Sequence, residues 1–146
     1  GTINFKSGTI VLDDKGALKS ADFIVDMNSI NTTDLSGEWK AKLDGHLKND
    51  DFFGVDKHKT SKLKLAKVIS RKGDTYEVET KLTIKGQTQP VKLKVKLADA
   101  GKTATGKLVF DRTKFGIKYG SGSFFKGLGD KMINDDIELD FVVKSK

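Results

Sequence analysis

Apolar and polar residues alternate with a period of two along most of this 146-residue chain. Because successive side chains of a strand point to opposite faces, this period predicts strands with one apolar and one polar face. Turn-forming stretches separate these strands, so neighbouring strands are expected to form antiparallel hairpins, as in a β-barrel or sandwich. The apolar runs lie at residues 3–5, 9–12, 23–27, 63–65, 76–84, 91–97, 108–110 and 137–143, and the main turns at 13–16, 71–74 and 99–102.

Two stretches interrupt the alternation. Residues 86–90, which end in the only proline, are expected to break the strand before them. In the other, Trp39, Leu43 and Leu47 are spaced four apart, which predicts one face of a short helix at about residues 36–48. Asp34 or Ser36 would provide the N-cap. A helix inserted between hairpins would lie across one mouth of a barrel.

Composition limits the classes of function. The length fits a single domain over residues 1–146, and the absence of Cys excludes disulfides, thiolate metal sites and thiol catalysis. The net charge of +7 comes almost entirely from lysines that alternate with apolar residues, as on the outer face of strands. This favours a solvated barrel exterior over a nucleic-acid surface, and leaves weak attraction to anionic membranes open. No apolar run approaches the roughly 20 residues that span a bilayer.

Aromatic residues and glycines are concentrated late in the chain. Five of the twelve aromatic residues fall between Phe110 and Phe125, and five of the fifteen glycines between Gly116 and Gly129. Glycines let the backbone bend or approach another group closely. The stretch therefore suits a barrel corner or a wall against which an apolar ligand lies.

Enzyme motifs fail where they are suggested. Residues 120–123 (GSGS) lack the spacing of a dinucleotide loop or a nucleophile elbow, and 101–103 (GKT) lacks the first glycine of a phosphate loop. The adjacent acids at 50–51 and 135–136 would point to opposite faces of a strand. His46 with one such acid falls short of the three or four ligands that zinc prefers. We expect no catalysis, no metal and no cofactor.

Three blocks of sequence resemble the YceI-like family, which consists of lipocalin-like barrels associated with polyisoprenoid binding. They are residues 23–32 (FIVDMNSINT), 45–53 (GHLKNDDFF) and 82–91 (LTIKGQTQPV), and residues 111–117 (DRTKFGI) are similar to the penultimate strand of that family. The resemblance covers nearly all of the chain. It implies an all-β fold: an antiparallel lipocalin-like β-barrel with a short helix inserted around residues 36–48.

The chain departs from this family in two places. Family members usually have a further strand before the block that Gly1 opens here, so an edge strand is expected to be missing. Such an edge would expose backbone donors and acceptors, and closure through a partner chain, as in a homodimer, stays open. His58 and Lys59 also stand where the family often has Tyr-Pro.

The resemblance implies a periplasmic or otherwise extracytoplasmic protein that binds a long-chain isoprenoid or similar lipid inside the barrel. Arg112 and His46 would meet the head group, although Arg112 could instead pair with Asp111, Asp135 or Asp136, and His46 could bond a backbone carbonyl. The alternative is a surface-association or interaction protein that uses its lysine-rich exterior. The side chains expected to line or fill the interior are Phe23, Val25, Trp39, Leu43, Leu47, Phe53, Leu63, Leu65, Val78, Leu82, Ile84, Leu93, Val95, Phe110, Phe115, Ile117, Phe124 and Met132.

Overall fold

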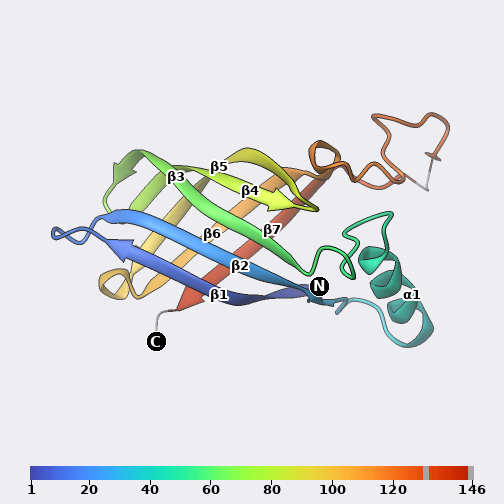
Figure 1. The fold of residues 1–146 in the computed structure, drawn as a ribbon, viewed down its shortest axis with the longest axis horizontal. Helices are drawn as coiled ribbons and strands as arrows, with labels where there is room; N and C mark the ends of the chain where they lie inside the picture. The colour runs from blue at the N-terminus through green and yellow to red at the C-terminus, as the bar shows by residue number, and fades with distance from the viewer. Residues whose placement is uncertain (130–131, 145–146) are drawn as a thin grey trace.

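The structure, a computed structural model, describes residues 1–129 and 132–144. Within these residues, one antiparallel sheet takes its strands in chain order and curls around an interior (Figure 1). Apolar side chains face this interior. The strands are β1 (Thr2–Leu12), β2 (Leu18–Asn31), β3 (Thr60–Lys72), β4 (Thr75–Ile84), β5 (Gln87–Ala98), β6 (Thr103–Asp111) and β7 (Asp136–Lys144). The predicted antiparallel lipocalin-like barrel with an inserted helix is confirmed, as a half-barrel whose sheet is curled but open.

The hairpin from β4 to β5 is tighter than the sequence suggested. Its ladder runs without interruption to the pair Ile84 and Gln87, and the two turn residues between them both have positive φ. The strand before the predicted break does end, at Ile84, but the break is confined to Lys85 and Gly86, and Pro90 lies inside β5. The ladder of β5 with β6 begins only at Lys94, so the missing N–H of Pro90 removes no bond to that neighbour.

Strands β1 and β7 are the two ends of the strand order in the part of the chain that the structure describes. The runs predicted at residues 3–5 and 9–12 merge into the single strand β1, which follows β2 through several register shifts. An unpaired strand edge leaves backbone groups accessible. The curled sheet thus has a lateral opening between these two strands.

Large aromatic rings cover glycines on the inner face of the sheet. Gly106 pairs with Phe141 across β6 and β7, and Gly8 pairs with Phe23 across β1 and β2. A Cβ atom at Gly106 would lie 2.6 Å from the Phe141 ring, and one at Gly8 would lie 2.4 Å from the Phe23 ring. Each glycine therefore makes room for a ring that lies across the neighbouring strand.

Helix α1 (Gly37–Lys48) and the irregular segment after β6 stand at the same end of the half-barrel (Figure 1). Helix α1 is fixed to the end of β2 by Asp44, which accepts hydrogen bonds from the Thr32 backbone N–H (2.9 Å) and hydroxyl (2.6 Å) and from Lys40 (2.6 Å). These bonds, first that from Lys40 and then that from the Thr32 hydroxyl, lower the pKa of Asp44 to about 2. No helix within residues 1–129 and 132–144 is long and apolar enough to cross a membrane.

The family-like stretch 111–117 does not continue as a strand. Strand β6 ends at Asp111, and the short 3-10 helix η2 (Arg112–Phe115) follows. The side chain of Asp111 caps η2 by accepting from the Thr113 N–H, and Gly116 ends it with φ of 80°. Extending the strand to Ile117 was therefore wrong, because the chain turns away from the sheet at Arg112.

Candidate ligand-binding cavity

A cavity of about 850 Å³ occupies the interior of the curled sheet. Its wall is made mainly of aliphatic and aromatic side chains from the inner faces of the strands, and Leu43, Leu47, Phe52 and Phe53 close in from the helical end. The volume is within the range of about 300–1,000 Å³ found for small-molecule sites. The alternation of the strands thus surrounds a space rather than a fully packed core.

Most of the side chains expected in the interior lie along this cavity. Whether they contact a ligand stays a prediction. Thirteen of the eighteen line the wall: Phe23, Val25, Leu43, Leu47, Phe53, Leu63, Leu65, Val78, Leu82, Ile84, Leu93, Val95 and Phe110.

The other five lie elsewhere: three are exposed and two are buried in packed core. Trp39 is 70% exposed, because it lies two turns before Leu47 and helix α1 extends past the barrel end over that length. Phe124 and Met132 are also exposed, since they belong to the segment that leaves the sheet. Phe115 and Ile117 are buried in packed core, where Phe115 meets Phe110 edge to face at 5.6 Å.

Several lining residues were missed although the sequence carried their signal. Leu97 and Leu108, and also the β7 residues Ile137, Leu139, Phe141 and Val143, have the same alternation as the predicted set. Phe52 was missed because it stands in a turn after helix α1, where no periodicity shows that both adjacent phenylalanines border the cavity.

The polar side chains on the inner wall are bonded within the protein. The Thr80 hydroxyl donates to the Val91 carbonyl at 2.8 Å, and the Ser61 hydroxyl donates to the Met27 sulfur at 3.0 Å. Among the described residues, no buried side-chain nitrogen or oxygen lacks a partner. The inner wall therefore offers apolar contact and few free hydrogen-bonding groups, as an apolar chain requires.

The cavity reaches the surface along the opening between β1 and β7. Every residue from Asp136 to Val143 borders it, and so does every residue from Gly1 to Phe5. Neighbouring residues of a strand point to opposite faces, so continuous lining of this kind means that the strand edges themselves form the rim. The charged residues on the cavity border are Asp34, Arg112, Asp136, Glu138 and Asp140.

The Arg112 side chain donates hydrogen bonds to carbonyls of the protein's own backbone. Its guanidinium, 1% exposed, donates from Nε to the Asn134 carbonyl at 2.9 Å, from Nη1 to Ile117 at 3.0 Å and from Nη2 to Ile133 at 3.0 Å. Burial lowers the pKa of Arg112, and the charge of Asp135 opposes this. The predicted salt-bridge alternative is thus a minor contact with Asp135 at 3.9 Å, beside three carbonyl bonds.

His46 lies outside the cavity wall. Its ring stands edge to face against Phe52 (4.8 Å) and Tyr119 (4.6 Å), and its Nε2 is 3.5 Å from Asp51. These contacts join the segment after helix α1 to the segment after β6. Within the described residues, no group of three His, Cys, Asp or Glu side chains is placed to hold a metal ion.

The GSGS stretch at residues 120–123 is part of the same scaffold. The hydroxyls of Ser121 and Ser123 each donate to Asp135 at 2.5 Å, to its Oδ1 and Oδ2 respectively. The bond from Ser121, followed by that from Ser123, lowers the pKa of Asp135. Both hydroxyls therefore hold the base of a loop.

Comparison with known proteins agrees with this architecture. A UPF0312 protein of Pectobacterium atrosepticum is 34% identical over 104 residues, 69% of this chain and 50% of that protein. One from Pseudomonas paraeruginosa is 31% identical, over 73% of this chain and 52% of its own length. These matches span about half the length of the curated relatives.

Two solved structures share the fold. Burkholderia cenocepacia BcnA superposes with a TM-score of 0.75 at 23% identity, over 98% of this chain and 84% of its own. The Campylobacter jejuni YCEI protein gives 0.71 at 22% identity, over 99% and 83%. The family model described as YceI-like domain matches residues 1–145, and the chain therefore belongs to the YceI-like family.

Proposed function

We propose that the protein binds one amphiphile with a long apolar chain, of the isoprenoid class, with the chain inside the half-barrel and the polar end at its rim. The YceI-like fold is a binding-protein fold and not an enzyme family, which supports a binding role. The observation that carries the proposal is the cavity of about 850 Å³, whose wall is apolar and whose inner hydroxyls are already bonded.

The rim favours a head group without negative charge. Four of the five charged residues on the cavity border are carboxylates, and three of these, Asp136, Glu138 and Asp140, lie on β7 at the rim. The fifth charged residue, Arg112, already donates three hydrogen bonds to carbonyls. A diphosphate placed there would face repulsion and lack a free cationic fork to bind it. The head-group roles predicted for Arg112 and His46 are replaced in this proposal by recognition of a neutral or cationic head.

Chain length and head charge together test the proposal. Each further buried methylene contributes about 0.8 kcal/mol, so affinity for isoprenoid alcohols should rise by about fourfold per methylene until the cavity is full. The diphosphate of the same chain should bind more weakly than the alcohol. Native mass spectrometry and competition with a fluorescent fatty probe would measure both.

A matched pair of variants tests whether the ligand lies inside the cavity. Ala21 borders the cavity from β2, whereas Ile24 on the same strand does not. Ala21→Trp should fill interior space and weaken binding of the longest alcohols by tenfold or more, while Ile24→Trp should bind like the wild type. Equal affinity of all three proteins for these alcohols would overturn the proposal, as would wild-type affinity independent of chain length.

The location that we propose for this protein rests on its similarity to the YceI-like family. We propose an extracytoplasmic, periplasmic or secreted location, where such a protein would store, transport or sense its ligand. Fractionation of the native host and detection of the protein with an antibody would test the location.

A further inference from the structure

The end of the half-barrel that carries helix α1 also carries a projecting apolar loop. We define the projecting loop as residues 116–129 with 132–133, which extends beyond the sheet after η2 (Figure 1). Its Tyr119, Phe124, Phe125 and Met132 are each about half exposed. Exposed apolar side chains grouped in this way mark an interaction surface.

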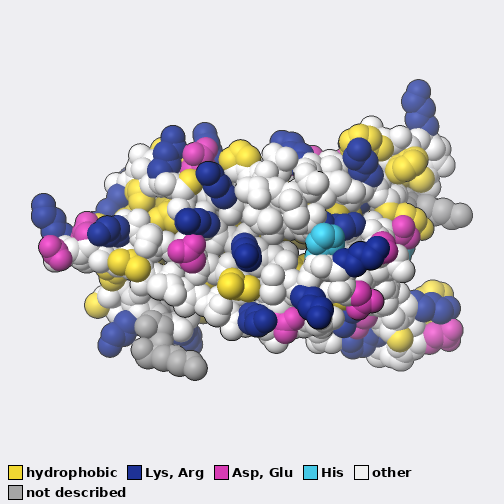
Figure 2. Space-filling view, in the orientation of Figure 1, with side chains coloured by type: hydrophobic (Ala, Val, Ile, Leu, Met, Phe, Trp, Pro, Cys, Tyr) yellow, Lys and Arg dark blue, Asp and Glu magenta, His cyan; other side chains and the backbone are white. Residues whose placement is uncertain are grey.

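The projecting loop is positively charged as well as apolar. Residues 116–129 and 132–133 include Lys118 and Lys126 and contain no Asp or Glu. The Lys118 ammonium lies 4.7 Å from the centre of the Phe124 ring. Apolar and basic side chains stand side by side on this part of the surface (Figure 2).

The loop is held in one shape by its own hydrogen bonds. The carbonyl of Ser121 accepts from the backbone N–H groups of both Phe124 (3.2 Å) and Phe125 (3.0 Å). The side chain of Ser121 is fully buried and bonded to Asp135. Gly122 leaves the space that the Met132 sulfur occupies, since a Cβ there would lie 2.6 Å from it. The aromatic tip is therefore presented without an ordering step at the time of contact.

We propose that the projecting loop docks the protein on an anionic lipid bilayer, with Phe124 and Phe125 inserted at the headgroup level and Lys118 and Lys126 near the lipid phosphates. Aromatic rings with an apolar body suit this depth, and each lysine near an anionic surface adds attraction. A convex tip needs no complementary pocket in a fluid interface. The proposal stands independently of what the cavity holds.

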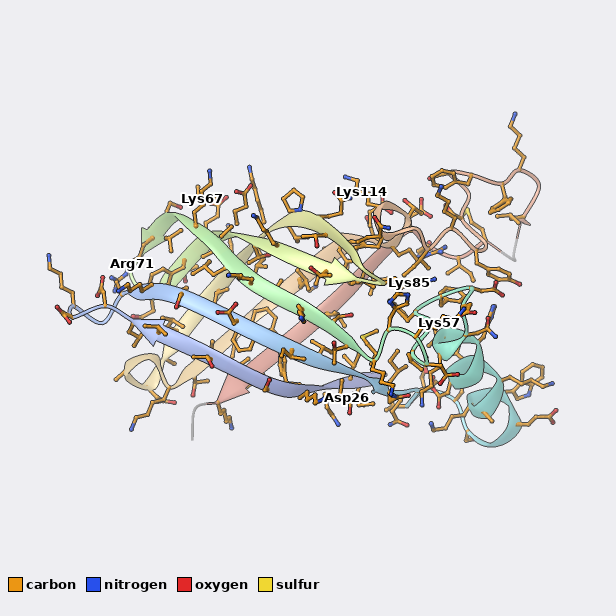
Figure 3. All side chains as sticks on the ribbon, in the orientation of Figure 1. Asp26, Lys57, Lys67, Arg71, Lys85 and Lys114 are labelled. Carbon is orange, nitrogen blue, oxygen red and sulfur yellow. The ribbon has the colours of Figure 1, made fainter. Side chains whose placement is uncertain are left out.

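Docking at this loop would bring the cavity to the membrane. Ile133 of the loop and Asn134 beyond it border the cavity, as do Leu43 and Leu47 of helix α1 at the same end. Lys114 lies at this end, whereas Lys67 and Arg71 lie at the opposite one (Figure 3). The lysine-rich barrel exterior, for which the sequence left weak attraction to anionic membranes open, would then remain in solvent.

Co-sedimentation with phosphatidylcholine vesicles, with and without phosphatidylglycerol, tests the docking. We expect binding only to the anionic vesicles, and on the order of tenfold weaker binding for Phe124→Ser with Phe125→Ser. Lys118→Ser with Lys126→Ser should also weaken it, by about fivefold per lysine. All four side chains are exposed, so the urea midpoint of each variant should match the wild type.

Two matched control variants test whether vesicles bind at the projecting loop. Val68→Ser with Ile69→Ser removes two exposed apolar side chains from the opposite end, and Lys92→Ser with Lys94→Ser removes the same charge from the barrel exterior. Both should bind vesicles like the wild type. Equal weakening by either control would overturn the proposal, and so would failure of the wild type to bind anionic vesicles.

The depth to which the loop inserts into the bilayer and the oligomeric state of the protein provide two further readouts. In a Trp39→Phe background, Phe124→Trp should shift its emission to the blue on anionic vesicles and be quenched by brominated lipids. Unchanged emission would contradict insertion. A dimer in lipid-free solution that Phe124→Ser with Phe125→Ser dissociates would show that the loop covers a second copy instead.

Discussion

Replacing Arg112 should loosen the end of the barrel whether or not a ligand is present. Each bond from a charged donor is worth about 1.5–3 kcal/mol. Three such bonds hold the carbonyls of Ile117, Ile133 and Asn134. At the lower bound these sum to about 4–5 kcal/mol, and Arg112→Met recovers about 1 kcal/mol through its apolar side chain.

We therefore expect Arg112→Met to lower the free energy of unfolding by about 3–4 kcal/mol, and Tm by about 10 °C for a chain of this size. Urea unfolding followed by circular dichroism would measure the loss. The N–H of Ile133 donates to the Gly120 carbonyl at 2.7 Å, and its rate of amide hydrogen exchange should rise in the same variant. Lys114→Met removes a neighbouring exposed cation and should change stability by less than about 0.5 kcal/mol.

Arg112→Lys separates the two roles considered for this residue. A lysine keeps the charge but lacks the planar fork, so a structural role predicts a loss of about 2–3 kcal/mol. A head-group role predicts wild-type stability and weaker binding of anionic amphiphiles alone. Wild-type urea midpoints for both the lysine and the methionine variants would refute the structural reasoning.

Two further predictions concern the bonds of Asp44 that hold helix α1 to the end of β2 and the space available for a Cβ atom at two glycines. The stability that Asp44 contributes is complete above its unfolded pKa of 3.8 and is lost as pH falls toward its folded value of about 2, so the difference in urea midpoint between wild type and Asp44→Asn should shrink over that interval. A constant difference would exclude the ion pair as its source. Gly106→Ala would place a Cβ atom 2.6 Å from the Lys94 carbonyl and should destabilise by about 1–3 kcal/mol. Gly45→Ala in helix α1 meets nothing within 4 Å and should stabilise by about 0.5–1 kcal/mol, and calorimetry showing the same sign for both would contradict this account.

The inner wall was largely predictable because it is made by regular strands. Along β4 the buried residues Tyr76, Val78, Leu82 and Ile84 follow the period of two without exception, and so the sequence alone assigned their face. Residues at bends and ends were not predictable in this way. Trp39 and Leu47 share a helical face, but helix α1 borders the cavity only from Leu43 to Leu47, and Trp39 is exposed.

The glycine-rich segment after β6 shows the same limit more strongly. Phe115 and Phe124 look equivalent in sequence, yet Phe115 is buried as the last residue of η2 and Phe124 is exposed on the projecting loop. What separates them is the turn at Arg112, whose bonds reach carbonyls up to 22 residues away. No local pattern encodes such partners.

The sequence by itself determined the antiparallel hairpins, the inward face of the regular strands and the inserted helix, because alternation and helical spacing are local properties of the chain. Only the tertiary structure decided that the interior is hollow, that the edges of β1 and β7 border it, and that Arg112 binds backbone carbonyls of a loop. These depend on how far the sheet curls and on which distant carbonyls surround one guanidinium. The curl of the sheet and the partners of Arg112 both depend on packing between segments that lie far apart in the sequence.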